Sequence, residues 1–198
     1  MCRYASSIWM GIIALCAVGA AAQAPQPTQA PQQPPAQAAQ QAPAQGTQEG
    51  PAGIDAITAY AGTWKVQGER FATAYSQAGK EERTLRNDCW KSGAYYACNQ
   101  FVDGESKTLL IFTYNDKDKM YITYQIPQGG AAAGSGKLQI VGNIWTFPWQ
   151  VTMGESTMYF HVVNVFTGTD RIDYAQEFSS DNVHWNTMAR GSETRVAK

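Results

Sequence analysis

The sequence predicts an all-β domain whose strands form one antiparallel up-and-down barrel of about eight to ten strands. Apolar and polar residues alternate in short segments from residue 63 almost to the C-terminus, which is the periodicity of strands. Turn-forming pairs such as Asp103-Gly104 and Gly142-Asn143 separate these segments, and no helix of useful length lies between them. Closing such a meander into a barrel removes its exposed edges.

The individual elements follow from the same alternation and its breaks. One loop, residues 127–136, is longer than the other turns and is rich in Gly and Ala. Besides a short helix over residues 54–61, we expect strands over residues 63–75, 82–90, 95–102, 107–114, 119–126, 137–141, 144–151, 157–167, 171–178 and 184–189, with a last piece near 194–196.

The first 22 residues have the pattern of a secretory signal peptide. Arg3 supplies the positive charge, residues 8–18 are apolar, and Ala20-Ala21-Ala22 forms a small-residue cleavage site. The apolar stretch is shorter than the roughly 20 residues that a spanning helix needs. We therefore expect cleavage before Gln23, no membrane span afterwards, and a periplasmic or secreted bacterial protein.

Two alternatives concern this N-terminal part. Cys16 could mark a lipoprotein, but it follows Leu15 rather than a small residue, which argues against lipidation. Residues 23–53 consist almost entirely of Ala, Gln and Pro with some Gly and Thr, so we expect a disordered, solvated linker. Its P-x-x-P spacing could serve recognition, but no basic residue flanks it, so a spacer is favoured. The barrel domain then comprises residues 54–198.

Charge excludes one class of partner. Without Arg3, the chain keeps 14 basic and 16 acidic residues, a net charge of −2. Neither a nucleic-acid surface nor a polybasic membrane patch follows from this balance. We expect no nucleic-acid partner.

The mature chain keeps two cysteines, Cys89 and Cys98, which we expect to form a disulfide in an oxidising compartment. If Gly93-Ala94 forms a two-residue type II′ turn, the two cysteines face each other at a non-hydrogen-bonded pair, where side chains approach closely. The alternative, a metal or redox pair, lacks neighbouring histidines and tight spacing.

Aromatic residues indicate the inner faces of several strands. Trp145, Phe147 and Trp149 occupy alternate positions of one strand. Tyr174 belongs to the apolar face of another, which is interrupted only by the amide of Gln176. Two more apolar faces consist of Leu110, Phe112 and Tyr114 in one strand and of Met120, Ile122, Tyr124 and Ile126 in the next. Some strands are apolar on both faces, as in a barrel backed by a helix or a partner.

The segment Gly62-Thr63-Trp64, preceded by a short helix, resembles the G-x-W signature of lipocalin-like (calycin) barrels. The resemblance implies that Trp64 closes one end of the barrel and packs on a basic side chain from the last strand, either Arg190 or Arg195. The C-terminal part, with Asp181-Asn182 before Trp185 and a final Thr194-Arg195, resembles exported bacterial lipocalin-like domains of unknown function. The likeness covers nearly all of residues 54–198 and implies a fold rather than a chemistry.

No catalytic pattern emerges, so we expect a protein that is not an enzyme and has no cofactor. His161 and His184 lack a second ligand at metal-binding spacing. Haem held by His161 is a remote alternative. No G-x-S-x-G motif occurs, and the acidic pairs flank turns, where charges are solvated.

Two function hypotheses remain. In the first, the barrel binds a small, largely apolar molecule. In the second, the same aromatic side chains fill the barrel, which then acts as a structural or interaction module of the cell envelope for an unknown protein partner. The candidate ligand-binding residues are Tyr114, Trp145, Phe147, Trp149, Tyr174 and Gln176.

Overall fold

The structure is a computed structural model that describes residues 53–129 and 133–196. The predicted signal peptide and all but the last residue of the predicted linker lie outside the described residues. Among the residues that are described, no helix is long and apolar enough to span a membrane.

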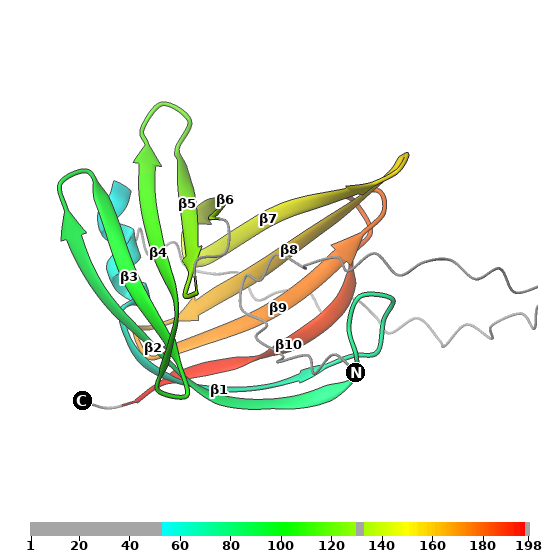
Figure 1. Ribbon diagram of the computed structural model, residues 1–198, viewed down its shortest axis with the longest axis horizontal. Coiled ribbons are helices and arrows are strands. Elements are labelled where there is room, and N and C mark those ends of the chain that lie inside the picture. Colours follow the sequence, from blue (N-terminus) through cyan, green and yellow to red (C-terminus); the bar gives the residue numbers. More distant parts are fainter. Residues whose placement is uncertain (1–52, 130–132, 197–198) are drawn as a thin grey trace, which may run out of the picture. The chain divides into compact units, whose positions relative to one another are not determined.

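The domain is a closed barrel of ten antiparallel strands, which confirms the predicted fold class (Figure 1). Each strand pairs with its neighbours in sequence, and β1 pairs with β10 to close the barrel. The strands are β1 Gly62–Arg70, β2 Gly79–Ser92, β3 Tyr95–Val102, β4 Glu105–Asn115, β5 Met120–Pro127, β6 Gly134–Val141, β7 Ile144–Met153, β8 Ser156–Thr167, β9 Arg171–Ser179 and β10 Asn186–Arg195.

Several strand boundaries differ from the sequence prediction. β2 spans Gly79–Ser92 rather than residues 82–90, and β6 begins at Gly134, inside the loop predicted over residues 127–136. The first strand ends at Arg70 because the chain then turns, and the Thr73 hydroxyl accepts hydrogen bonds from the backbone N–H groups of Tyr75 and Ser76, both at 3.0 Å. At the C-terminus, the two predicted pieces form one strand, β10, with an irregularity between Thr187 and Ala189. A bulge of this kind shifts the alternation of inward and outward side chains, so the sequence pattern of one strand looks like that of two.

The hairpin of β2 and β3 carries the predicted disulfide. Cys89 pairs in register with Cys98, their Cα atoms are 4.0 Å apart, and the two sulfurs are bonded. Gly93 has a φ of 57°, as the first position of a type II′ turn requires. The hairpin prediction and the disulfide are therefore confirmed.

The inner face of β5 is the opposite of the predicted one. Tyr121 and Thr123 are buried, whereas Tyr124 and Ile126 are 43% and 40% exposed. The reason is register: Thr123 lies opposite the buried Phe112 of β4, so it shares that inner face. The continuous apolar row of β5 consequently faces outward.

A short 3₁₀ helix, η1 (Gly53–Tyr60), covers the end of the barrel at which β1 begins (Figure 1). Ile57 and Tyr60 are fully buried, and the Tyr60 ring lies 6.5 Å from Phe112 and 6.1 Å from Trp145, between ring centroids. At the opposite end, Tyr75 from the β1–β2 connection packs edge-on against two aromatic rings, those of Phe160 and Phe178. Aromatic groups thus occupy both ends of the barrel.

Candidate functional site

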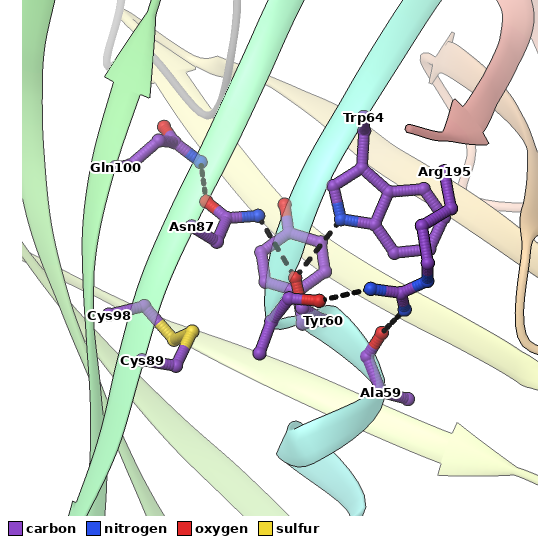
Figure 2. The surroundings of a disulfide bond; sticks show 9 residues. Ala59, Tyr60, Trp64, Asn87, Cys89, Cys98, Gln100 and Arg195 are labelled. Carbon is purple, nitrogen blue, oxygen red and sulfur yellow. Dashed lines mark hydrogen bonds between the residues drawn. A yellow bond between two sulfur atoms is a disulfide. The ribbon is translucent and has the colours of Figure 1, made fainter. Parts of the chain in front are cut away.

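The closed end is organised around Trp64, which is fully buried at the start of β1. The guanidinium of Arg195 lies over its ring, 4.0 Å from the centroid (Figure 2). The same guanidinium donates to the carbonyl oxygens of Ala59 and Ala61 at 3.1 and 2.5 Å. Arg195 therefore satisfies the last carbonyls of η1 and contacts the indole at once.

Arg190, the other candidate partner of Trp64, lies elsewhere. It forms an ion pair with Glu69 at 2.8 Å, and its guanidinium lies 5.3 Å from the Phe71 ring centroid. Its side chain is largely exposed. Of the two arginines that the sequence offered, the one that contacts Trp64 is Arg195.

Gly62 is needed by this arrangement. Its φ is 115°, and a Cβ atom there would lie 2.4 Å from Nη1 of Arg195. No other residue combines that backbone conformation with that space. The position of the Arg195 guanidinium therefore explains why a glycine lies two residues before Trp64.

Hydrogen bonds tie β2 and β3 to the same end (Figure 2). The carbonyl oxygen of Tyr60 accepts from Nε1 of Trp64 at 3.3 Å and from Nδ2 of Asn87 at 3.2 Å. Gln100 in turn donates to Oδ1 of Asn87 at 3.3 Å. Both amides are buried, and sequence analysis had not singled them out. Their alternation with Leu85 and Cys98 was the available signal.

The six predicted ligand-binding residues all fall on the inner register of their strands, but they do not form one wall. Trp145 belongs to the closed end, where its ring lies 4.6 Å from that of Phe166. Trp149 lies toward the opposite end and stacks on Phe160 at 5.4 Å. The remaining four differ in burial: Phe147 and Tyr174 are buried, and Tyr114 and Gln176 are half-buried.

The inner surface of the barrel also carries buried polar groups. Thr123, Asn164 and Glu193 are fully buried on β5, β8 and β10. Within the described part of the chain, neither the Thr123 hydroxyl, nor either polar atom of the Asn164 amide, nor either carboxyl oxygen of Glu193 has a hydrogen-bond partner. An unsatisfied buried polar group costs about 1–3 kcal/mol, so three of them on one inner surface need an explanation.

Glu193 lies close to a buried ion pair. Arg83 and Glu81, both on the inner register of β2, form a salt bridge and are almost fully buried. Tyr174 of β9 donates to Oε2 of Glu81 at 3.0 Å. It reaches across β10 and β1, because Gly68 leaves the space: a Cβ there would lie 2.3 Å from the tyrosine hydroxyl.

The surroundings of Glu193 favour its neutral form. Burial raises the pKa of its carboxyl to about 8, the positive charge of Arg83 limits that rise, and the negative charge of Glu81 adds to it. The pKa of Tyr60 is raised well above its ordinary value, mainly by burial and then by Glu193. At neutral pH the Glu193 carboxyl therefore carries a proton and offers one donor and one acceptor.

Neither histidine faces this interior. His161 is on the outer register of β8, where Nε2 lies 2.7 Å from Oε2 of Glu177 and the imidazole stacks on Trp185, with centroids 3.6 Å apart. His184 is exposed beside Asp181, at 2.7 Å. Among residues 53–129 and 133–196, no group of three or more His, Cys, Asp or Glu side chains could hold a metal ion.

Comparison with known proteins adds little. No protein-family model matches the chain, and no curated protein matches it. A search of solved structures found the crystal structure of Rv2717c from M. tuberculosis, which is 8% identical, with a TM-score of 0.42. The match covers 73% of this chain and 97% of that one. No functional conclusion rests on a likeness at this level.

Proposed function

We propose that this chain is an exported, non-enzymatic binding protein that holds a small, largely apolar molecule inside its barrel. The observation that carries the proposal is a set of buried polar groups that have no hydrogen-bond partner among the described residues: Thr123, Asn164 and Glu193. Ligand sites typically combine apolar walls with a few convergent polar groups, and such groups are left unpaired when the ligand is absent. A side-chain-filled core would instead pair them or replace them.

The apolar part of the site would come from the aromatic side chains at both ends of the barrel. Phe147 is buried on the inner register between Trp145 and Trp149. Tyr75 and Phe178 contribute rings at the end opposite η1. A molecule lying between these groups would contact mostly aromatic carbon, which explains why we expect a largely apolar ligand.

Two further features support the class and the compartment. Gly62, Trp64 and Arg195 are arranged as the resemblance to lipocalin-like barrels implies, so we assign the chain to that class as part of the proposal. The disulfide between Cys89 and Cys98 is typical of exported proteins and supports a periplasmic or secreted location.

The test is native mass spectrometry of the protein purified after natural export, without added ligand. We expect a mass above that of the mature chain, and the excess should be a small molecule that denaturation releases. The matched control is Asn164→Leu, which should lose most of the excess. A chain that carries nothing under gentle ionisation, and that gains nothing when a library of apolar molecules is added, would contradict the proposal.

One observation favours a second candidate, an interaction module of the envelope. Trp90, Tyr95, Tyr124 and Ile126 are 47%, 41%, 43% and 40% exposed on β2, β3 and β5. Trp90 and Tyr124 lie on one row across the sheet, with Ala97 and Ile111 between them. Adjacent exposed apolar groups often mark a protein contact. A bare chain in the experiment above, together with envelope association that Tyr124→Lys abolishes, would favour this candidate.

A further inference from the structure

We propose that the polar end of the ligand is uncharged, as in an alcohol, ketone, ester or amide, and that it binds Glu193 and Asn164 inside the barrel. This inference rests on the proposed function and specifies the substrate class of the same site. It follows from the charges on the inner surface and from the atoms that remain unpaired there.

Among the described residues, the charges around Glu193 leave no free cation for an anionic ligand. Arg83 is in a salt bridge with Glu81, and Glu81 also accepts from Tyr174. Glu193 adds a second carboxyl to the same region. A carboxylate or phosphate entering here would meet two acidic groups and one arginine that is already matched, so its desolvation would not be compensated.

The other two arginines on the inner register lie at the ends of their strands. Arg195 lies two residues after Glu193 on the same face of β10, but its guanidinium is held by Trp64 and by the carbonyl oxygens of Ala59 and Ala61. Arg70 is at the other end of β1, whereas Glu193 pairs in register with Val66.

A cationic ligand is disfavoured for a different reason. An ammonium group at Glu193 would require the carboxyl to ionise, although burial and Glu81 favour its protonated form. It would also lie near Arg83, whose charge acts on Glu193 directly. Both the loss of the proton and the repulsion by Arg83 would oppose binding.

The unpaired atoms belong to groups that are neutral at pH 7 and that both donate and accept. Protonated Glu193 has one O–H donor and one free carbonyl oxygen, and the Asn164 amide has two N–H donors and one acceptor. Asn164 pairs in register with Tyr174, and Tyr174 with Gly191, two residues before Glu193 on β10. The two side chains are therefore on the inner register of β8 and β10, with β9 between them, and both can exchange hydrogen bonds with a carbonyl or hydroxyl group.

Binding should therefore depend on pH in a defined way. The charged and titratable groups that act on Glu193 are Arg83 and Glu81 from β2, Tyr60 from η1 and Tyr174 from β9. While Glu193 is protonated it donates to the ligand, and above a pH of about 8 it loses that proton. The affinity for a neutral ligand should be constant from pH 6 to 7 and should fall above pH 8.

The experiment compares three molecules with the same tail and different heads: 1-decanol, decanoate and decylamine, with the six-carbon series as a check on tail length. Binding to the mature protein is followed at pH 6.5 by tryptophan fluorescence and calorimetry. We expect the alcohol to bind at least tenfold more tightly than either charged molecule. An equal or tighter complex with decanoate or decylamine would overturn the inference while leaving the proposed function intact.

Substitutions of Glu193 and Asn164 test whether these residues bind the polar end of the ligand. Glu193→Gln keeps a neutral donor and acceptor, so it should bind the alcohol within about threefold of wild type and lose the weakening above pH 8. Glu193→Leu should bind at least tenfold more weakly, and Asn164→Leu serves as the second variant if Glu193→Leu does not fold. The surface change Glu82→Gln should alter nothing, because Glu82 is exposed beside Lys65. If wild type binds none of these molecules, this inference fails, whereas the proposed function is decided separately by the native mass spectrum.

Discussion

Two pairs of buried polar side chains inside the barrel differ in their hydrogen bonding. At the closed end, Asn87 and Gln100 are buried and hydrogen-bonded to each other, and Asn87 also binds the carbonyl oxygen of Tyr60. On β8 and β10, Asn164 and Glu193 are equally buried, and their polar side-chain atoms have no hydrogen-bond partner among the described residues. The first arrangement contributes to stability by itself. Under the proposed function, a bound molecule completes the second.

Removing the centre of the closed end should have the largest effect. Trp64→Ala deletes a fully buried indole and leaves Arg195 without the ring that it covers. We expect the free energy of unfolding to fall by about 3–5 kcal/mol, as for other buried aromatic truncations. Urea denaturation measures it, with Trp90→Ala as the matched control because Trp90 is 47% exposed. A similar loss in both variants would show that Trp64 has no special part in closing the barrel.

Substitution of Gly62 should have the next largest effect on stability. Gly62→Ala places a Cβ against Nη1 of Arg195 and forces an L-residue to a φ of 115°. We expect a loss of about 2–3 kcal/mol, of which strained backbone accounts for about 1 kcal/mol or more. The control Gly142→Ala also has positive φ, 59°, but nothing lies within 4 Å of its Cβ position. If the two variants lose the same stability, the contact with Arg195 is not what selects glycine.

The titration of Glu193 should make the free energy of unfolding depend on pH. The pKa of Glu193 is raised in the folded protein, to about 8 from an ordinary 4.5, so the folded state holds a proton that the unfolded state releases. The stability that this proton contributes is complete below about pH 4.5 and is lost as the pH rises toward 8. Glu193→Gln should remove this loss and be more stable than wild type at pH 8 but not at pH 4.5.

Urea midpoints of both proteins at several pH values between 4.5 and 8.5 test this expectation. Glu82→Gln is the control and should follow wild type, because Glu82 is exposed. Parallel profiles for wild type and Glu193→Gln would mean that Glu193 titrates as it does in the unfolded chain.

The sequence predicted much of the fold because its signals are local. Alternation and turn pairs located every strand, and the Cys89–Cys98 spacing located the disulfide. The prediction for the inner face of β5 was wrong because its apolar row, which includes Tyr124 and Ile126, faces outward. The inner face carries Tyr121 and Thr123, and only the register with β4 decides between the two faces.

The candidate site was predicted only in its aromatic part. Arg83 and Glu193 are separated by 110 positions in the chain and become neighbours only when β1 joins β2 to β10. Charged residues on a strand are ordinarily solvated, so nothing local marked these as buried. Glu193 does lie two residues before Arg195, and a shared face with the partner of Trp64 was the one available signal.

The most direct test of the account compares two buried asparagines, Asn87 and Asn164, through Asn87→Leu and Asn164→Leu. Free energies of unfolding by urea and affinities for 1-decanol are measured for both variants. We expect Asn87→Leu to lose about 1–3 kcal/mol of stability, because it removes the hydrogen bonds of Asn87 with the carbonyl oxygen of Tyr60 and with Gln100, and to keep its ligand affinity if it folds. Asn164→Leu should be as stable as wild type, or more so, and should bind at least tenfold more weakly. If Asn164→Leu is instead destabilised like Asn87→Leu and its ligand affinity is unchanged, Asn164 belongs to an ordinary core. The central claim, that Asn164 and Glu193 bind a ligand, is then wrong.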